Sequence, residues 1–261
     1  MLTTRLTQIE INSVGPTSLP VKKPITIYNL LSGYVELQQP ATTRDLDILL
    51  ASKNSSSSAE SLQDLAAHYA DKVFKKRLSV LDILEENKDV EVSLSAFLQM
   101  LPSMRIRQYS ISSSPLWNAE RVSLTLSVVD APALSGRAEP FLGVASTYLA
   151  GLRPGDKVQL AVRASNVAFH PPNDLSTPLV MICAGSGLAP MRGFLQERAM
   201  QKLAGREVAR SLLFFGCRSP KEDLLYGDSD LKEWRELGVV DIRPAFSRSS
   251  TDSENCRYVQ E

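Results

Sequence analysis

The 261-residue chain has few of the residues from which metal sites and disulfide frameworks are built. Its only histidines, His68 and His170, do not supply a zinc-type ligand cluster. Its three cysteines, Cys183, Cys217 and Cys256, are widely spaced and form no C-x-x-C pair. This sparse, odd set argues against a disulfide framework and for a reducing compartment, so we expect no metal and a cytoplasmic location.

An excess of one charge and long apolar runs are also missing. Lysine plus arginine and aspartate plus glutamate number 29 each, which leaves no net charge. Nothing therefore indicates a nucleic-acid-binding surface or a polybasic membrane patch. No run of about 18 apolar residues is present, so we expect no membrane segment in this chain.

The first part of the chain, to about residue 103, predicts helices. Thr42 and Ser79 each begin a variant capping box, with an aspartate three residues later. Apolar residues between 62 and 73 fall on one helical face. The serine-rich stretch 52–61 before them is expected to be a solvated linker between helices.

The middle of the chain predicts strands. Residues 107–113, 121–129 and 157–162 alternate apolar and polar side chains, and turns containing proline or glycine separate them. Short strands of this kind are typical of a small antiparallel barrel.

The last part, from about residue 177, predicts alternating strands and helices. Residues 178–182 form a continuous apolar run, as expected of a strand buried on both faces. Further strands are expected at 212–215 and 239–242, with helices between them. This order predicts a parallel, doubly wound sheet.

A short motif at the start of the first barrel strand combines three useful side chains. Arg107 offers a cation for a phosphate, Tyr109 a ring for stacking, and Ser110 a hydroxyl for hydrogen bonding. Together they favour a flavin dinucleotide. Residues 143–146 open a helix and offer N–H groups to a pyrophosphate, although simple helix capping is an alternative for them.

A glycine-rich loop follows the first expected parallel strand. Gly185 and Gly187 let the backbone approach a ligand, and the next helix presents its N-terminus there. The spacing G-x-G-x-x-P departs from the common dinucleotide fingerprint at Pro190. A tight strand-to-helix turn without a ligand is the alternative.

Cations and hydroxyls gather after the second and third expected strands. They are Arg218, Ser247, Arg248, Arg257 and Tyr258. Arginines at the carboxyl ends of parallel strands suit a 2′-phosphate and favour NADP over NAD. An ordinary solvated loop is the alternative.

Taken in order, these motifs resemble the ferredoxin–NADP reductase superfamily in its diflavin branch. The resemblance is closest to NADPH–haemoprotein reductases, especially the reductase region of fused monooxygenase–reductase proteins. It implies a two-domain α+β fold that begins with an antiparallel FAD-binding β-barrel over residues 1–175, incomplete at its N-terminus and carrying a helical insertion at about 25–104. An α/β NADP-binding domain with a doubly wound parallel sheet, truncated at its C-terminus, would follow over residues 176–261.

The resemblance also implies roles for the motif residues. Ser110 would orient the reaction at flavin N5 as the catalytic residue. The implied FAD contacts are Arg107, Tyr109, Ser110, Gly143, Val144 and Ser146. The implied NADPH contacts are Gly185, Ser186, Gly187, Arg218, Ser247, Arg248, Arg257 and Tyr258.

The reaction implied by the resemblance is hydride transfer from NADPH to FAD. Electrons would then pass through an FMN domain to a haem-thiolate monooxygenase; FMN and haem would belong to missing or partner domains. The family's final Cys-Gly-Asp segment has no counterpart here. Two alternatives therefore stay open: a catalytically incomplete fragment without activity, or the reductase part of a sulfite reductase or nitric oxide synthase.

Overall fold

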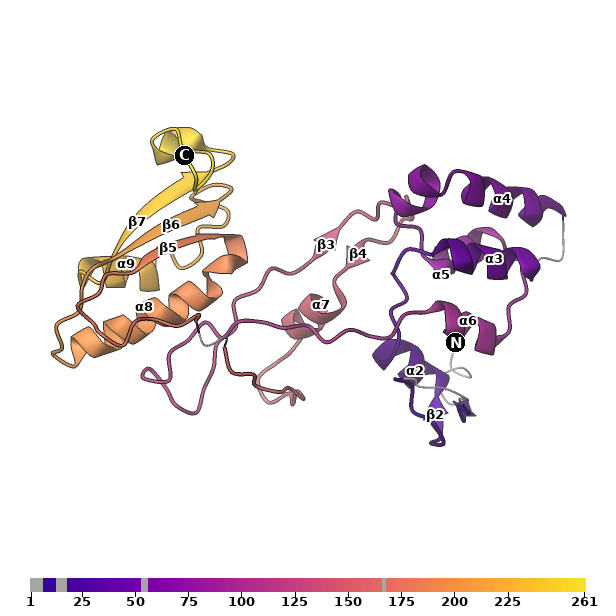
Figure 1. The fold of residues 1–261 in the computed structure, drawn as a ribbon, viewed down its shortest axis with the longest axis horizontal. Coiled ribbons are helices and arrows are strands. Elements are labelled where there is room, and N and C mark those ends of the chain that lie inside the picture. Colours follow the sequence, from indigo (N-terminus) through magenta and orange to yellow (C-terminus); the bar gives the residue numbers. More distant parts are fainter. Residues whose placement is uncertain (1–6, 13–17, 53–55, 166–167) are drawn as a thin grey trace. The chain divides into compact units, whose positions relative to one another are not determined.

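The structure is a computed structural model that describes residues 7–12, 18–52, 56–165 and 168–261 (Figure 1). The chain divides into two compact units. Unit 1 comprises Met1–Arg107 and Val129–Gly143, and unit 2 comprises Gln108–Val128 and Val144–Glu261. Each unit has its own cluster of buried apolar side chains. No helix in these described ranges has the length and apolarity needed to cross a membrane.

Unit 1 is mainly helical. Its helices are α2 (Ile27–Gly33), α3 (Thr43–Ala51), α4 (Ser56–Ala67), the π-helical turn Ala70–Phe74, α5 (Val80–Glu86) and α6 (Leu94–Met100). Two antiparallel ladders accompany them: β1 (Gln8–Ile9) pairs with β2 (Ile25–Thr26), and β3 (Asp130–Ala131) pairs with β4 (Phe141–Leu142).

Both predicted capping boxes are confirmed. Thr42 begins α3 and Ser79 begins α5, and each side chain bonds reciprocally with the aspartate three residues later. The apolar faces of these helices then pack into one core, whose fully buried members are Leu46, Leu49, Leu62, Val73 and Ile83.

The prediction of a linker over the serine-rich stretch is wrong for residues 56–61, while 53–55 lie outside the described residues. Helix α4 begins at Ser56. Serine is only a weak helix former, but tertiary packing overrides such preferences. Ala59 and Leu62 are buried within this helix, and their packing stabilises its first turns.

Unit 2 contains a three-stranded sheet that is parallel, as predicted, and its strands lie in the order β5-β6-β7. Its strands are β5 (Val180–Ala184), β6 (Ser211–Cys217) and β7 (Val240–Phe246). Its helical elements are α7 (Val144–Ala150), the 3-10 turns Gly185–Gly187 and Ser250–Ser253, α8 (Leu188–Leu203) and α9 (Asp230–Glu236).

Helices α8 and α9 cover the same face of this sheet, because both contribute to one buried cluster with alternate strand residues (Figure 1). Met181 and Cys183 of β5 belong to that cluster. On the other face, Val180 and Ile182 are 65% and 59% exposed. The prediction that this strand is buried on both faces is therefore wrong, since the described residues pack against one face only.

The predicted strands at 107–113, 121–129 and 157–162 form no regular ladder, and the described residues contain no closed sheet. One antiparallel bridge joins Ile111 to Leu124. The apolar side chains that would face a barrel interior, such as Leu160, are exposed instead. A period of two predicts an extended backbone, but a barrel also requires neighbouring strands that pair in sequence around it.

Candidate functional site

The loops at the carboxyl ends of the three parallel strands form one edge of unit 2, which we call the sheet-edge site. It consists of Gly185, Ser186, Gly187, Arg218, Ser247 and Arg248. In parallel α/β sheets, ligands bind outside the carboxyl ends of the strands. Because the three strands are parallel, these motifs lie at the same edge of the sheet, as predicted.

The loop after β5 leads directly into the longest helix of the unit. Gly185 has φ +51°, a backbone conformation that residues other than glycine adopt only with strain. A tight turn at Gly185–Gly187 follows, and α8 begins at Leu188. The backbone N–H of Leu188 donates to Gly185 O and Ser186 O, and the partial positive charge at the start of this helix suits a pyrophosphate.

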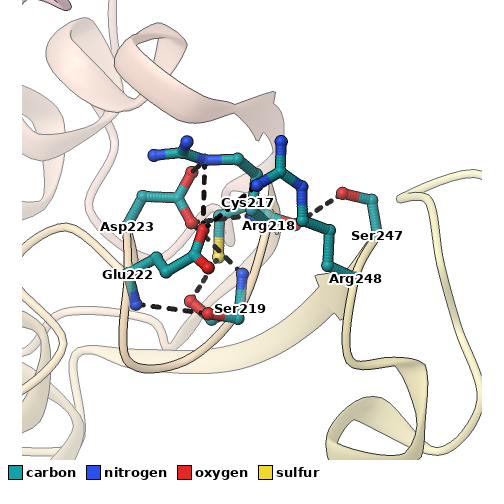
Figure 2. A network of polar contacts seen from close by, with 7 residues as sticks. All are labelled: Cys217, Arg218, Ser219, Glu222, Asp223, Ser247 and Arg248. Atoms are coloured by element: carbon teal, nitrogen blue, oxygen red, sulfur yellow. Dashed lines mark hydrogen bonds and ion pairs between the residues drawn. The ribbon is translucent and has the colours of Figure 1, made fainter.

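Arg218, at the end of β6, is held by two acids (Figure 2). Its Nε lies 2.9 Å from Asp223 Oδ2 and 3.6 Å from Glu222 Oε2. Burial alone raises the pKa of Asp223, but the bond from Arg218 and those from the backbone N–H groups of Arg218 and Ser219 outweigh it and lower that pKa. Asp223 therefore stays ionised and orients Arg218.

Arg248, at the end of β7, faces the same acid. Its Nη1 lies 3.6 Å from Glu222 Oε2, so this carboxylate is shared between two guanidinium groups (Figure 2). The backbone N–H of Arg248 donates to Arg218 O (2.8 Å), and that of Ser247 donates to Cys217 O (3.0 Å). Both arginine side chains are more than half exposed, which leaves them accessible to a phosphate.

Cys217 lies at the base of this edge but is not suited to nucleophilic chemistry. Burial, with a contribution from Asp223, raises the pKa of its thiol to about 11. Burial likewise raises the pKa of Cys183 to about 12. Both remain thiols at neutral pH, and the thiolate is the reactive form.

Arg257 and Tyr258 follow the 3-10 turn after β7. The guanidinium carbon of Arg257 lies 6.0 Å from the ring centroid of Tyr258, and both backbone N–H groups donate to Glu261 Oε2. Among the described contacts, none joins either side chain to Arg218, Ser247 or Arg248. The structure thus brings together the guanidinium groups of Arg218 and Arg248 but not that of Arg257.

The proposed flavin motif is divided between the two units. Arg107 belongs to unit 1, and Tyr109 and Ser110 belong to unit 2. Tyr109 is half-buried and Ser110 is exposed. The second motif is divided in the same way.

Gly143 ends unit 1, while Val144 and Ser146 belong to α7 of unit 2. Ser146 is buried and Val144 is 40% exposed. Residues 143–146 thus lead into a helix, as predicted.

Glu36 was missed as a functional candidate. This buried carboxylate accepts hydrogen bonds from Arg107 Nη1 and from the backbone N–H of Arg105. The bond from Arg107 is the main cause that lowers the pKa of Glu36. An acid between Val35 and Leu37, in an otherwise apolar run, was the available signal.

A second feature missed by sequence reasoning is a cavity of about 260 Å³ in unit 1. Its polar lining consists of Gln38, Arg77, Asp82, Ser135 and Arg137, and apolar residues of the β3–β4 connection and of β4, such as Leu134 and Phe141, complete it. Gln38 Oε1 is buried and accepts no hydrogen bond from the described residues.

The chemistry of this lining fits one part of a dinucleotide. Arg77 forms no ion pair with the described residues, whereas Arg137 is paired with Asp82 at 3.2 Å. Arg77 thus offers a cation, Gln38 an acceptor, and Phe141 apolar surface. Ligand cavities commonly span about 300–1,000 Å³, so this one is too small for a whole dinucleotide.

In comparison with known proteins, both parts of the chain match a protein family. The FAD binding domain family matches residues 3–148, and the oxidoreductase NAD-binding domain family matches residues 181–258. A self-sufficient cytochrome P450 monooxygenase of Phanerodontia chrysosporium is 67% identical over 254 residues, which cover 97% of this chain and 24% of that protein.

A bifunctional cytochrome P450/NADPH–P450 reductase of Fusarium oxysporum is 46% identical over 255 residues, with the same two coverages. Another bifunctional protein with that description, from Acremonium egyptiacum, is 48% identical over 246 residues, covering 94% of this chain and 23% of its own length. The chain therefore spans about a quarter of the length of these relatives.

Proposed function

This chain belongs to the FAD binding domain family and continues into an oxidoreductase NAD-binding domain, and we propose that it is the module that transfers hydride from NADPH to FAD. The resemblance to the reductase region of fused monooxygenase–reductase proteins is confirmed, since relatives of that kind match nearly the whole chain. The observation that carries the proposal is the sheet-edge site, where a glycine-rich loop and two arginines follow parallel strands. In the sequence, this site comes after the region matched by the FAD binding domain family.

The NADPH side of the proposal uses the sheet-edge site. The N–H groups at the start of α8 bind the pyrophosphate, and Gly185 and Gly187 allow its close approach. Arg218 and Arg248 bind the 2′-phosphate, which replaces Glu222 as their shared anion. Ser186 and Ser247 add hydroxyls, and we propose Arg257 and Tyr258 as further contacts on the same side.

The FAD side of the proposal uses the two motifs expected from the sequence. Arg107, held by Glu36, binds the pyrophosphate, and Tyr109 packs against the isoalloxazine. Ser110 donates its hydroxyl hydrogen bond toward the flavin atom that receives hydride. Gly143, Val144 and Ser146 add backbone and hydroxyl contacts.

The cavity of unit 1 receives the nucleotide portion of FAD in this proposal. Arg77 and Gln38 would bind its polar groups, while Phe141 contacts its base. When bound, FAD supplies the chemistry, because it accepts two electrons as hydride and releases them singly. The protein side chains bind, orient and shield it.

We further propose the domain division expected from the sequence, with an FAD-binding domain over residues 1–175 and an NADP-binding domain over 176–261. In the longer protein, electrons would pass to an FMN domain and then to a haem-thiolate monooxygenase. Support for that route comes from relatives whose names join a cytochrome and its reductase in one chain.

The test is an absorption spectrum of the purified protein after incubation with FAD and desalting. The proposal predicts a retained flavin band that anaerobic NADPH bleaches. A band that is retained but not bleached would contradict the hydride-transfer proposal. Loss of the band on desalting would contradict the FAD site itself.

A further inference from the structure

Helix α8 contacts the segment 111–114, which directly follows Ser110 in the chain. The backbone N–H of Ser114 donates to Gln196 Oε1 (2.9 Å), and its hydroxyl donates to Glu197 Oε2 (2.7 Å). All of these residues belong to unit 2, although the segment lies in the region matched by the FAD binding domain family.

Arg192 makes a further buried contact with this segment. Its side chain is only 10% exposed, and its Nη1 donates to the carbonyl oxygen of Ser112 (2.5 Å). Its Nε donates to Asp230 Oδ2 (2.7 Å), and its guanidinium carbon lies 4.4 Å from the ring centroid of Tyr226. At neighbouring Gly193, an added Cβ would lie 3.5 Å from the carbonyl oxygen of Ile111, which is ordinary van der Waals contact and shows that the helix packs directly against the segment.

A third connection starts from the same aromatic ring. The hydroxyl of Tyr226 shares a hydrogen bond of 2.8 Å with Thr125 Oγ1. The guanidinium of Arg192 is thus held by the carboxylate of Asp230, the ring of Tyr226 and the carbonyl oxygen of Ser112. Together these three contacts fix its orientation. Such a planar group, with donors at fixed angles, positions a backbone more strictly than a lysine ammonium does.

These contacts connect the NADPH-binding loop to the segment that follows Ser110, the residue proposed to lie at the flavin. Helix α8 begins immediately after the loop Gly185–Gly187, and segment 111–114 begins immediately after Ser110. We propose that Arg192 is a positioning residue that sets the distance between the NADPH-binding loop and Ser110. This inference rests on the proposed function and deepens it, because it names what aligns the nicotinamide with the flavin.

Two variants test the inference, and one arginine provides a matched control. Arg192→Lys keeps the charge but loses the fixed donor geometry, and Gln196→Leu removes the acceptor for Ser114 N–H. Gln196→Glu keeps an acceptor and serves as the conservative rescue. Arg206→Lys makes the same chemical change at an exposed position after α8 and is the control.

Three quantities are measured for each variant: the rate at which NADPH bleaches bound FAD, the Kd values for FAD and NADP⁺, and amide hydrogen exchange. Both test variants are expected to slow bleaching by about 10- to 100-fold, since a small misplacement of reacting groups costs that much. The two Kd values are expected to stay within about twofold, because the binding residues are unchanged. Exchange across residues 111–114 is expected to rise in Gln196→Leu, without added cofactor, and to return toward wild type in Gln196→Glu.

The outcomes separate this inference from the proposed function. Wild-type protein that NADPH does not bleach would overturn the proposed function, and the inference with it. Normal wild-type bleaching with equally fast bleaching in both test variants would overturn the inference alone. Loss of FAD or NADP⁺ affinity in proportion to the rate would also overturn it, because that pattern reports a structural role.

Discussion

At the scale of single residues, the sheet-edge site depends on how its two carboxylates pair with its two arginines. Glu222 lies 3.6 Å from both Arg218 and Arg248, while Asp223 holds Arg218 alone. A phosphate with more charge and more acceptor oxygens competes well with one exposed carboxylate. Before NADPH binds, Arg218 and Arg248 thus both pair with Glu222, and the phosphate of the ligand can replace this carboxylate.

Replacement of Arg248 by alanine is expected to raise the KM for NADPH by about 10-fold while leaving that for NADH nearly unchanged, because only NADPH carries the 2′-phosphate. Steady-state reduction of an artificial acceptor measures both constants. Arg210→Ala is the matched control, since Arg210 pairs with Asp241 near the amino ends of the strands. An equal rise for both coenzymes would contradict the assignment of Arg248.

Glu36 carries a prediction about pH. Its pKa is lowered in the folded protein, mainly by Arg107, so the folded state binds fewer protons there than the unfolded state. Its contribution to stability is therefore complete above the unfolded pKa, near 4.5, and is lost as pH falls through the lower folded pKa.

Denaturant unfolding of wild type and Glu36→Gln between pH 3 and 7 tests this sign. The variant is expected to be less stable by about 1–3 kcal/mol at neutral pH, and the difference is expected to shrink toward pH 3. A difference that stays constant across this range would show that Glu36 does not act through its charge.

At the scale of elements, local chemistry predicted the helices well and the strands of the middle region poorly. Capping boxes are local, so Thr42 and Ser79 marked their helix starts from sequence alone. The parallel strands were also predictable because apolar runs alternate with helices. Strand ladders in residues 107–162 depend on distant partners, and alternation alone does not supply them.

The cap of α3 offers a direct test at this scale. Thr42→Ala is expected to destabilise unit 1 by about 1 kcal/mol, because it removes the side-chain acceptor for the backbone N–H of Asp45. Thr42→Ser keeps the hydroxyl and is expected to remain close to wild type. Far-UV circular dichroism in denaturant measures both, and equal losses in the two variants would contradict the capping account.

At the scale of the whole molecule, the chain contains two separate cores. One is built from α3 to α6 and the other from the parallel sheet with α8 and α9. The sequence predicted two domains from the change of pattern near residue 177. It did not predict that Gln108–Val128 joins the compact unit of the sheet, because that depends on buried contacts such as Arg192 with Ser112.

Two cores predict two unfolding transitions. Both tryptophans, Trp117 and Trp234, belong to unit 2, so fluorescence reports that unit alone, whereas circular dichroism also reports the helices of unit 1. We expect the two thermal curves to differ, and 2′,5′-ADP at about 100 times its Kd to stabilise unit 2, the unit that fluorescence reports, by about 2.7 kcal/mol without stabilising unit 1. Coincident curves that shift together would contradict this independence.

The central claim is that hydride passes directly from NADPH to FAD bound in this protein. The most direct measurement is anaerobic stopped-flow bleaching of the bound flavin with NADPH that carries deuterium at the transferred C4 position. The account predicts bleaching that is slower with deuterated than with ordinary NADPH, because the C4–H bond breaks in that step. Absence of bleaching, or bleaching at the same rate with deuterated and ordinary NADPH, would contradict the account.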